Sequence, residues 1–194
     1  WFLDKGRRDG HVSWTGQPSV IRLPKGEYAL AAEIYEAGGA ETTFAAQGQL
    51  IIDGEHRKVT VDARGGEPVS VTVPKQGAEP QSVWISAVGP WFGQGIGGSD
   101  FTGLFTKNLG PRTELPDYAT YLKATFGQRG ADGTFEGTPY LYSTFYLEPG
   151  TMVTGFRRTA RQSDFAEVKA DHAVQAGVDL IGKGSFADHE VLHG

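Results

Sequence analysis

The chain has 194 residues, of which 39% are hydrophobic and 11% aromatic, with no cysteine and a formal net charge of -5. This is a globular composition, and the lack of cysteine excludes disulfide bonds, cysteine-based zinc sites and thiol nucleophiles. The acidic balance gives no basic field for nucleic acid, and no apolar run reaches the roughly 18 residues of a membrane span, so we expect neither nucleic acid nor a membrane as a partner.

The start of the chain suggests a piece or a processed product of a longer protein. The first residue is Trp1, and the single methionine is Met152. The N-terminal sequence WFLDKGRRDG lacks the apolar segment of a signal peptide.

Apolar and polar residues alternate with a period of two through most of the chain, which predicts β-strands. In residues 27–36, Tyr28, Leu30, Ala32 and Ile34 fall on one face of a half-buried strand. Turn residues such as Asp53-Gly54 and Asp132-Gly133 separate the alternating segments. The pattern indicates an all-β fold, an antiparallel β-sandwich, with further strands at 19–23, 42–52, 57–62, 69–73, 82–88, 119–126 and 140–148.

The segment GPWFGQGIGG, residues 89–98, interrupts this pattern. Its glycine content predicts poor pairing in a sheet. We place a boundary near residue 89, which separates two packed sandwich units at 1–88 and 89–194 or marks a long loop within one unit. In the second part, residues 164–175 predict a short helix with Asp164 as its N-cap.

The glycine-rich segment also matches a dinucleotide-binding pattern through Gly93, Gly95 and Gly98. No helix is expected after it, so we interpret the match as a connector and expect no cofactor. No serine has the G-x-S-x-G context of a hydrolase nucleophile, and no pair of carboxylates stands out. The sequence therefore predicts no catalytic residue.

The C-terminal sequence HEVLH contains the H-E-x-x-H signature of zinc peptidases through His189, Glu190 and His193. On a helix, the two histidines would hold zinc and the glutamate would act as a general base. Only Gly194 follows His193, and a third ligand would have to come from upstream, from His172 or Glu167. We therefore expect a chance match that binds no zinc.

Aromatic residues at 140–147 provide a candidate ligand site. Tyr140, Tyr142 and Tyr146 share one face of a predicted strand, and Leu141, Phe145 and Leu147 share the other. Tyrosines on an exposed sheet could stack on sugar rings or peptides, with Trp91 as a further candidate and Trp84 and Phe92 equally ambiguous. Because both faces are apolar, we expect instead a central strand with its tyrosine face mostly buried.

Two stretches of the sequence resemble known proteins. IRLPKGEYAL, residues 21–30, resembles the L-P-x-G-x-Y element of carboxypeptidase-regulatory-like β-sandwiches. VTVDARGGEPVSVTVP, residues 59–74, resembles a stretch downstream of the catalytic domain in large secreted subtilisin-like serine peptidases of actinobacteria. The runs GTPYLYSTFYLEPGTMVTGFRR and DFAEVKADHAVQ are similar to the next part of those peptidase chains, so the resemblance covers about residues 12–176.

This resemblance implies a secreted, multidomain parent protein and a carboxypeptidase-regulatory-like sandwich at 1–88. The D-T-G, H-G-T-H and G-T-S-M-A motifs of subtilisin-like catalytic domains have no counterpart in the chain, so no catalytic residue is carried over. We expect a non-catalytic accessory region whose partners are the parent's catalytic domain and a protein or carbohydrate substrate. The alternatives are a carbohydrate- or cell-surface-binding sandwich module and a zinc metallopeptidase fragment.

Overall fold

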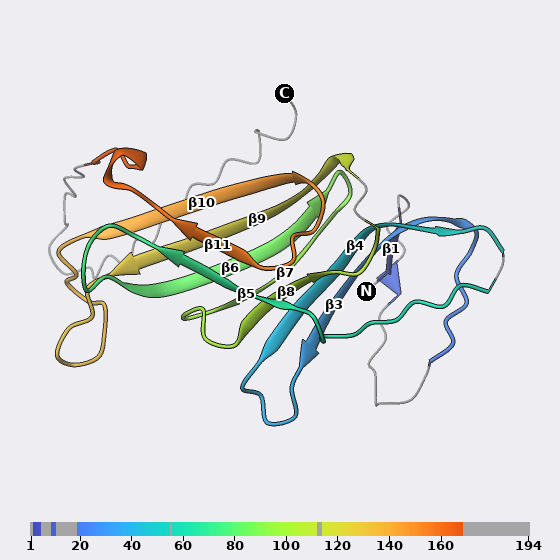
Figure 1. The fold of residues 1–194 in the computed structure, drawn as a ribbon, viewed down its shortest axis with the longest axis horizontal. Coiled ribbons are helices and arrows are strands. Elements are labelled where there is room, and N and C mark those ends of the chain that lie inside the picture. Colours follow the sequence, from blue (N-terminus) through green and yellow to red (C-terminus); the bar gives the residue numbers. More distant parts are fainter. Residues whose placement is uncertain (1, 5–8, 11–18, 55, 112–113, 169–194) are drawn as a thin grey trace, which may run out of the picture. The chain divides into compact units, whose positions relative to one another are not determined.

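A computed structural model describes residues 2–4, 9–10, 19–54, 56–111 and 114–168 of the chain. The chain divides into two units, 1–160 and 161–194. The larger unit is all-β, as predicted, and its strands form two sheets (Figure 1). Within the described residues, no helix is long and apolar enough to cross a membrane.

The larger sheet is seven-stranded and mixed. β4 pairs with β8 in parallel, β5 pairs with β11 in parallel, and the other neighbours are antiparallel. From one edge to the other, the sheet consists of β11 (Phe156–Thr159), β5 (Glu67–Thr72), β8 (Leu104–Asn108), β4 (Thr42–Ile52), β3 (Gly26–Tyr35), β1 (Phe2–Asp4) and β2 (Asp9–Gly10).

The smaller sheet is four-stranded and antiparallel throughout. From one edge to the other it consists of β10 (Leu141–Gly150), β9 (Leu115–Gly127), β6 (Glu79–Gly89) and β7 (Phe92–Gly98). The long strands β6 and β9 occupy its centre, because each of them has apolar residues at alternate positions that pack into the core.

One hydrophobic core lies between the two sheets. Phe44 and Val69 of the larger sheet and Ile85 and Leu122 of the smaller sheet belong to the same buried cluster. Alternate residues of β5, β6 and β9 supply much of this core, as expected for a sandwich. The fold class predicted from the period-two pattern is therefore confirmed.

The glycine-rich segment near residue 89 is not a linker. Pro90 and Trp91 form a two-residue turn between β6 and β7, and β7 pairs with β6 along its whole length. Glycine is required in this strand, since a β-carbon at Gly95 would lie 2.3 Å from the backbone oxygen of Ile85. The core takes residues from both sides of residue 89, and the division into units falls after Ala160.

Most predicted strands are present, and two are not. Residues 19–23 and 57–62 have no strand structure, although they alternate in the required way. Val20 is 83% exposed, which shows that alternation alone does not produce a strand without a neighbouring strand to pair with. In β3, the expected half-buried pattern is wrong for Tyr28–Ala31, which are buried on both faces.

The smaller unit is described only for residues 161–168. A single 3-10 turn spans Gln162–Asp164, and the Arg161 backbone N–H donates a 2.7 Å hydrogen bond to the Asp164 carboxylate. Phe165 is extended, with φ -115° and ψ 140°, so the helix expected at 164–175 does not continue through 165–168. Residues 169–175 lie outside the described part of the chain.

Candidate functional site

The four-stranded sheet has one face toward the core and one face away from it. In an antiparallel sheet, directly paired residues place their side chains on the same face. Ile85 and Leu122 are paired and fully buried, which identifies the core side. Trp84 therefore lies on the opposite side, in one row with Lys123 and Phe145. We call this side the outer face; it carries Ser82, Trp84, Tyr121, Lys123, Thr125, Leu141, Ser143, Phe145 and Leu147, beside the bare backbone of Gly95 and Gly97. Ser86, Val88 and Ala119 lie on the same side but are buried.

Trp84 lies along the surface of the outer face. Its indole Nε1 donates a hydrogen bond to the Tyr121 hydroxyl in β9, at 3.2 Å. On the other side of β6, a β-carbon at Gly97 would lie 2.7 Å from the indole Cε3. The ring therefore extends from β9 to β7 instead of standing upright, and Trp84 is 44% exposed.

Aromatic and aliphatic side chains continue this surface toward β10. The Tyr121 and Phe145 rings stack with their centroids 5.7 Å apart and their planes 25° apart. Phe145 is 50% exposed, and Leu141, farther along the same strand, is 59% exposed. The apolar surface thus spans β6, β9 and β10.

Hydroxyl groups and one cation complete the outer face. The Ser82 and Thr125 hydroxyls are hydrogen-bonded at 2.6 Å, and Ser143 pairs with Thr125 on the next strand. In the three rows that pass through Ser82, Trp84 and Ser86, Lys123 is the only charged residue. A flat aromatic surface with neighbouring hydroxyls can stack on a sugar ring or pack against an apolar protein surface.

The tyrosines predicted as ligand contacts lie elsewhere. Tyr142 and Tyr146 are on the core side of β10, where they pack against the core as partly buried residues. The Tyr146 ring is 5.6 Å from Phe156. Tyr140 precedes β10, is half-buried, and meets Tyr142 edge-on at 5.7 Å.

The expected central position of this strand is wrong, because β10 is at an edge of its sheet. Its two apolar faces have separate explanations. One face packs on the core through Tyr142 and Tyr146, and the other adds Leu141 and Phe145 to the outer face.

Trp91, the fourth predicted contact, is not near the tyrosines. It lies in the turn after the C-terminal end of β6 and packs against Phe92 with ring centroids 5.2 Å apart. The start of β10, next to Tyr140, is level with the N-terminal end of β6. Because β6 has 11 residues, about 30 Å of strand separates the two positions.

The residues of the HEVLH motif, His189, Glu190 and His193, lie outside the part of the chain that the structure describes. Among the described residues, no group of histidine, aspartate and glutamate side chains is arranged to hold a metal ion.

Sequence reasoning did not single out Tyr121 as a site residue. Alternation in 119–126 shows which side chains share a face, but it does not show which face is toward the core. The structure supplies that information, because Leu122 pairs with Ile85 and both are fully buried, so the neighbouring Tyr121 lies on the outer face in one row with Leu147.

Comparisons of the chain with protein-family models, with curated proteins and with solved structures found no match.

Proposed function

We propose that this chain is a non-catalytic accessory region of a secreted subtilisin-like serine endopeptidase and that it contacts its partner through the outer face. The resemblance of residues 59–74 supports the family, and an all-β unit is in keeping with such a region. The observation that carries the proposal is the exposed, continuous aromatic surface around Trp84 and Phe145.

A soluble protein seldom exposes neighbouring large apolar side chains without a partner for them. Trp84, Phe145 and Leu141 are each more than two-fifths exposed on one sheet face. Tryptophan and tyrosine are also the residues that contribute most to protein interfaces, since their rings bury a large area and keep a polar group for a hydrogen bond. The partner in this proposal is the peptidase domain itself or the polypeptide that it cleaves.

The direct test begins with the reading frame that encodes the chain. If a subtilisin-like domain is encoded upstream, that domain and this chain are produced separately and their binding is measured by titration calorimetry. We expect the double variant Trp84→Ala, Phe145→Ala to weaken binding at least about tenfold. Ile51→Ala is the matched control, because Ile51 is 54% exposed but belongs to the other sheet. A reading frame without a peptidase domain would contradict the proposal.

The non-catalytic character is tested on the chain alone. Purified protein is incubated with casein and with a fluorophosphonate probe for reactive serines. We expect no cleavage and no labelled serine, and specific labelling of one serine would refute this part of the proposal.

Carbohydrate binding is the second candidate function, and the orientation of Trp84 favours it. A flat indole next to a hydrogen-bonded Ser82–Thr125 pair offers both a stacking surface and partners for sugar hydroxyls. The test is depletion of the protein from solution by cellulose, chitin or xylan. Trp84→Ala should abolish depletion and Trp91→Ala should leave it intact, whereas equal loss in both variants would exclude the outer face as the sugar site.

A further inference from the structure

β7 is an edge strand of the four-stranded sheet, and no strand of the described residues pairs with its outer edge. Gly89 and Phe92 close the two-residue turn of the β6–β7 hairpin, so they are the first mutually hydrogen-bonded pair. In an antiparallel ladder, bonded and non-bonded pairs alternate. Consequently, the backbone N–H and C=O groups of Gly93, Gly95 and Gly97 point away from β6 toward the free edge.

This edge lacks the features that usually prevent strands from pairing with other chains. Its sequence, FGQGIGG, contains no charged residue and no proline, and its register with β6 has no bulge. The opposite edge of the sheet is different. There, β10 contains Glu148 and Pro149, and its register shifts at Pro149/Gly150.

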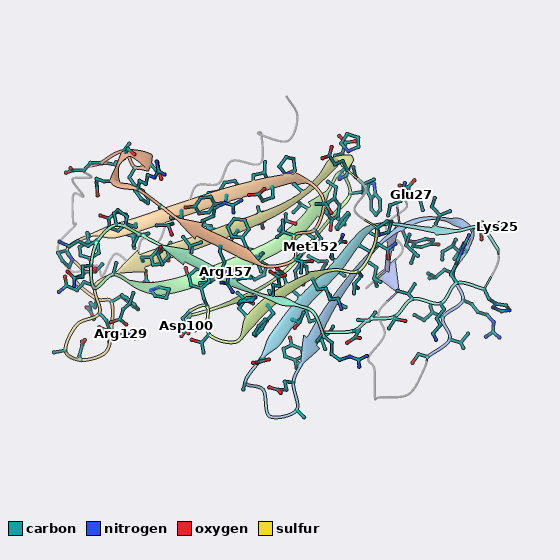
Figure 2. All side chains as sticks on the ribbon, viewed as in Figure 1. Lys25, Glu27, Asp100, Arg129, Met152 and Arg157 are labelled. Atoms are coloured by element: carbon teal, nitrogen blue, oxygen red, sulfur yellow. The ribbon has the colours of Figure 1, made fainter. Side chains whose placement is uncertain are left out.

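A groove lies beside the free edge of β7. Ile96 and Gly97 form one side of it, and Tyr35, Thr42 and Leu104 of the larger sheet contribute to the other. Asp100, in the loop after β7, also lines the groove (Figure 2). On β7 the groove is lined by Ile96, Gly97 and Gly98, at the C-terminal end of the strand. An extended segment that starts in this groove and continues along the edge toward Gly93 could hydrogen-bond to the β7 backbone and place side chains against the apolar lining.

The charged residues around the groove indicate which charge a bound segment would carry. Asp100 lines the groove, and Glu36 and Glu41 flank the hairpin turn that closes one end of it, where the Glu36 N–H donates to the Glu41 oxygen at 2.9 Å. The Tyr35 hydroxyl bonds to Glu33 at 2.5 Å. Residues 26–54 and 83–106, which supply the whole lining, contain no lysine, arginine or histidine.

Two lysines lie on strands near the groove. Lys123 is on the outer face and is separated from β7 by β6, and Lys107, three residues after Leu104 in β8, donates hydrogen bonds to the backbone oxygens of Asp62 and Arg64. A second copy of this chain would bring the same carboxylates against Asp100 and Glu41, which is unfavourable. A segment with positive side chains would bring opposite charges together. The acidic rim therefore favours a basic partner over self-association.

We infer that the free edge of β7 binds an extended, positively charged polypeptide segment by strand addition, with Gly93, Gly95 and Gly97 supplying the backbone hydrogen bonds and Asp100 contributing to charge recognition. This inference goes beyond the proposed accessory role and does not depend on it.

The probe is a synthetic peptide of about nine residues in which lysine alternates with valine, long enough for one strand. It is titrated into the full chain labelled with nitrogen-15. We expect shifts and slower hydrogen exchange at the amides of Gly93, Gly95 and Gly97, whereas β10 amides stay unchanged. Binding should weaken with salt, and a peptide with glutamate in place of lysine should not bind.

Two variants at one position give the matched control. A β-carbon at Gly93 meets only Val88 Cγ1, at 3.6 Å, so the site has room for a side chain. Gly93→Ala keeps the outward N–H and should bind normally. Gly93→Pro removes that N–H, at an edge position where proline is tolerated, and should weaken binding about tenfold or more. Asp100→Asn keeps an acceptor for the Thr102 N–H and should weaken binding less.

A peptide methylated on alternate backbone nitrogens removes any dependence on protein variants. Methylation along the edge that pairs with β7 should abolish binding, and methylation along the other edge should preserve it. Equal binding by both methylated peptides, or normal binding by folded Gly93→Pro, would overturn the inference. Concentration-dependent dimerisation without peptide, with the same three glycine amides protected, would instead assign the edge to a second copy of the chain.

Discussion

Both faces of the four-stranded sheet carry large apolar side chains, but the two faces have different surroundings. On the core side, Ile85, Leu122 and Ala124 are fully buried against the larger sheet. On the outer face, Trp84 and Phe145 are about half exposed. The apolar character of a strand face therefore does not by itself show that the face is in the core.

The outer face also differs from the core side in the contacts that position its side chains. Core residues contact one another in a closed cluster, whereas Trp84 is positioned by one hydrogen bond to Tyr121 and by the absence of a side chain at Gly97. Such a surface can be altered with little effect on the fold. If the outer face is functional, substitutions there should separate stability from binding, and substitutions on the core side should not.

The largest expected effect is on the core side. Leu122→Ala removes a fully buried side chain from the centre of β9 and should lower the free energy of unfolding by about 2–5 kcal/mol. Urea unfolding followed by tryptophan fluorescence measures it. A decrease in the free energy of unfolding of less than about 1 kcal/mol would mean that the core side is no more tightly packed than the outer face.

A glycine on the outer face should give the next largest effect. Gly95→Ala places a β-carbon 2.3 Å from the Ile85 oxygen, so β6 and β7 must move apart, at a cost of about 1–3 kcal/mol. Gly93→Ala is the control, since its β-carbon has ordinary contacts. Equal unfolding midpoints for the two variants would show that β7 does not approach β6 this closely.

Trp84→Ala should cost about 1 kcal/mol of stability, because the ring is partly exposed and its contacts are with the surface. We expect Trp84→Ala to reduce the free energy of partner binding by more than it reduces the free energy of unfolding. A stability loss similar to that of Leu122→Ala would indicate that Trp84 is structural and would weaken the case for a functional outer face.

A smaller change is expected from a tyrosine on the core side. The Tyr118 hydroxyl is buried and has no hydrogen-bond partner among the residues that the structure describes, and burial raises the pKa of Tyr118. Tyr118→Phe removes this unsatisfied group and should leave stability unchanged or raise it by up to about 1 kcal/mol. Tyr28→Phe is the control, because the Tyr28 hydroxyl donates to the Pro24 oxygen at 3.0 Å, so its loss should cost about 1 kcal/mol. Equal destabilisation of Tyr118→Phe and Tyr28→Phe would show that the two hydroxyl groups do not differ in hydrogen bonding.

The sequence predicted the strands better than the site. The expected strands at 42–52 and 119–126 are present as β4 and β9, each of which pairs with a strand on both sides in its sheet. Alternation wrongly predicted a strand at 57–62, where no strand pairs with the segment. It also wrongly interpreted the glycines of β7, since glycine was taken to prevent pairing when close strand approach required it.

The outer face could not be assembled from the sequence, because it depends on register. Trp84, Tyr121 and Phe145 come from three strands, and a shift of one residue in any of them would turn its ring toward the core. The sequence offered the tyrosines of 140–146 as candidate contacts but favoured a mostly buried tyrosine face, and Tyr142 and Tyr146 do pack against the core as partly buried residues. Their alternation was right, but the side of β10 that faces the solvent was the one with Leu141 and Phe145.

The smallest effect is expected at a contact that belongs to neither face, in the loop before β5. The Arg64 guanidinium donates to both oxygens of the Asp62 carboxylate, at 2.8 to 3.0 Å, and these bonds lower the pKa of Asp62 from 3.8 to about 2. The folded state therefore favours the ionised carboxylate. Its contribution to stability is present above the unfolded value of 3.8 and is lost as the pH falls through about 2. Because the Arg64 side chain is exposed and the Asp62 side chain is partly exposed to solvent, salt should weaken this contribution. Carbon-detected NMR of the Asp62 carboxyl group across this pH range measures the pKa directly. Arg64→Gln should return it toward 3.8, and Arg64→Lys should give an intermediate value because lysine lacks the planar fork that binds both oxygens. An unshifted pKa in the unsubstituted protein would show that the Asp62–Arg64 contact does not persist in solution.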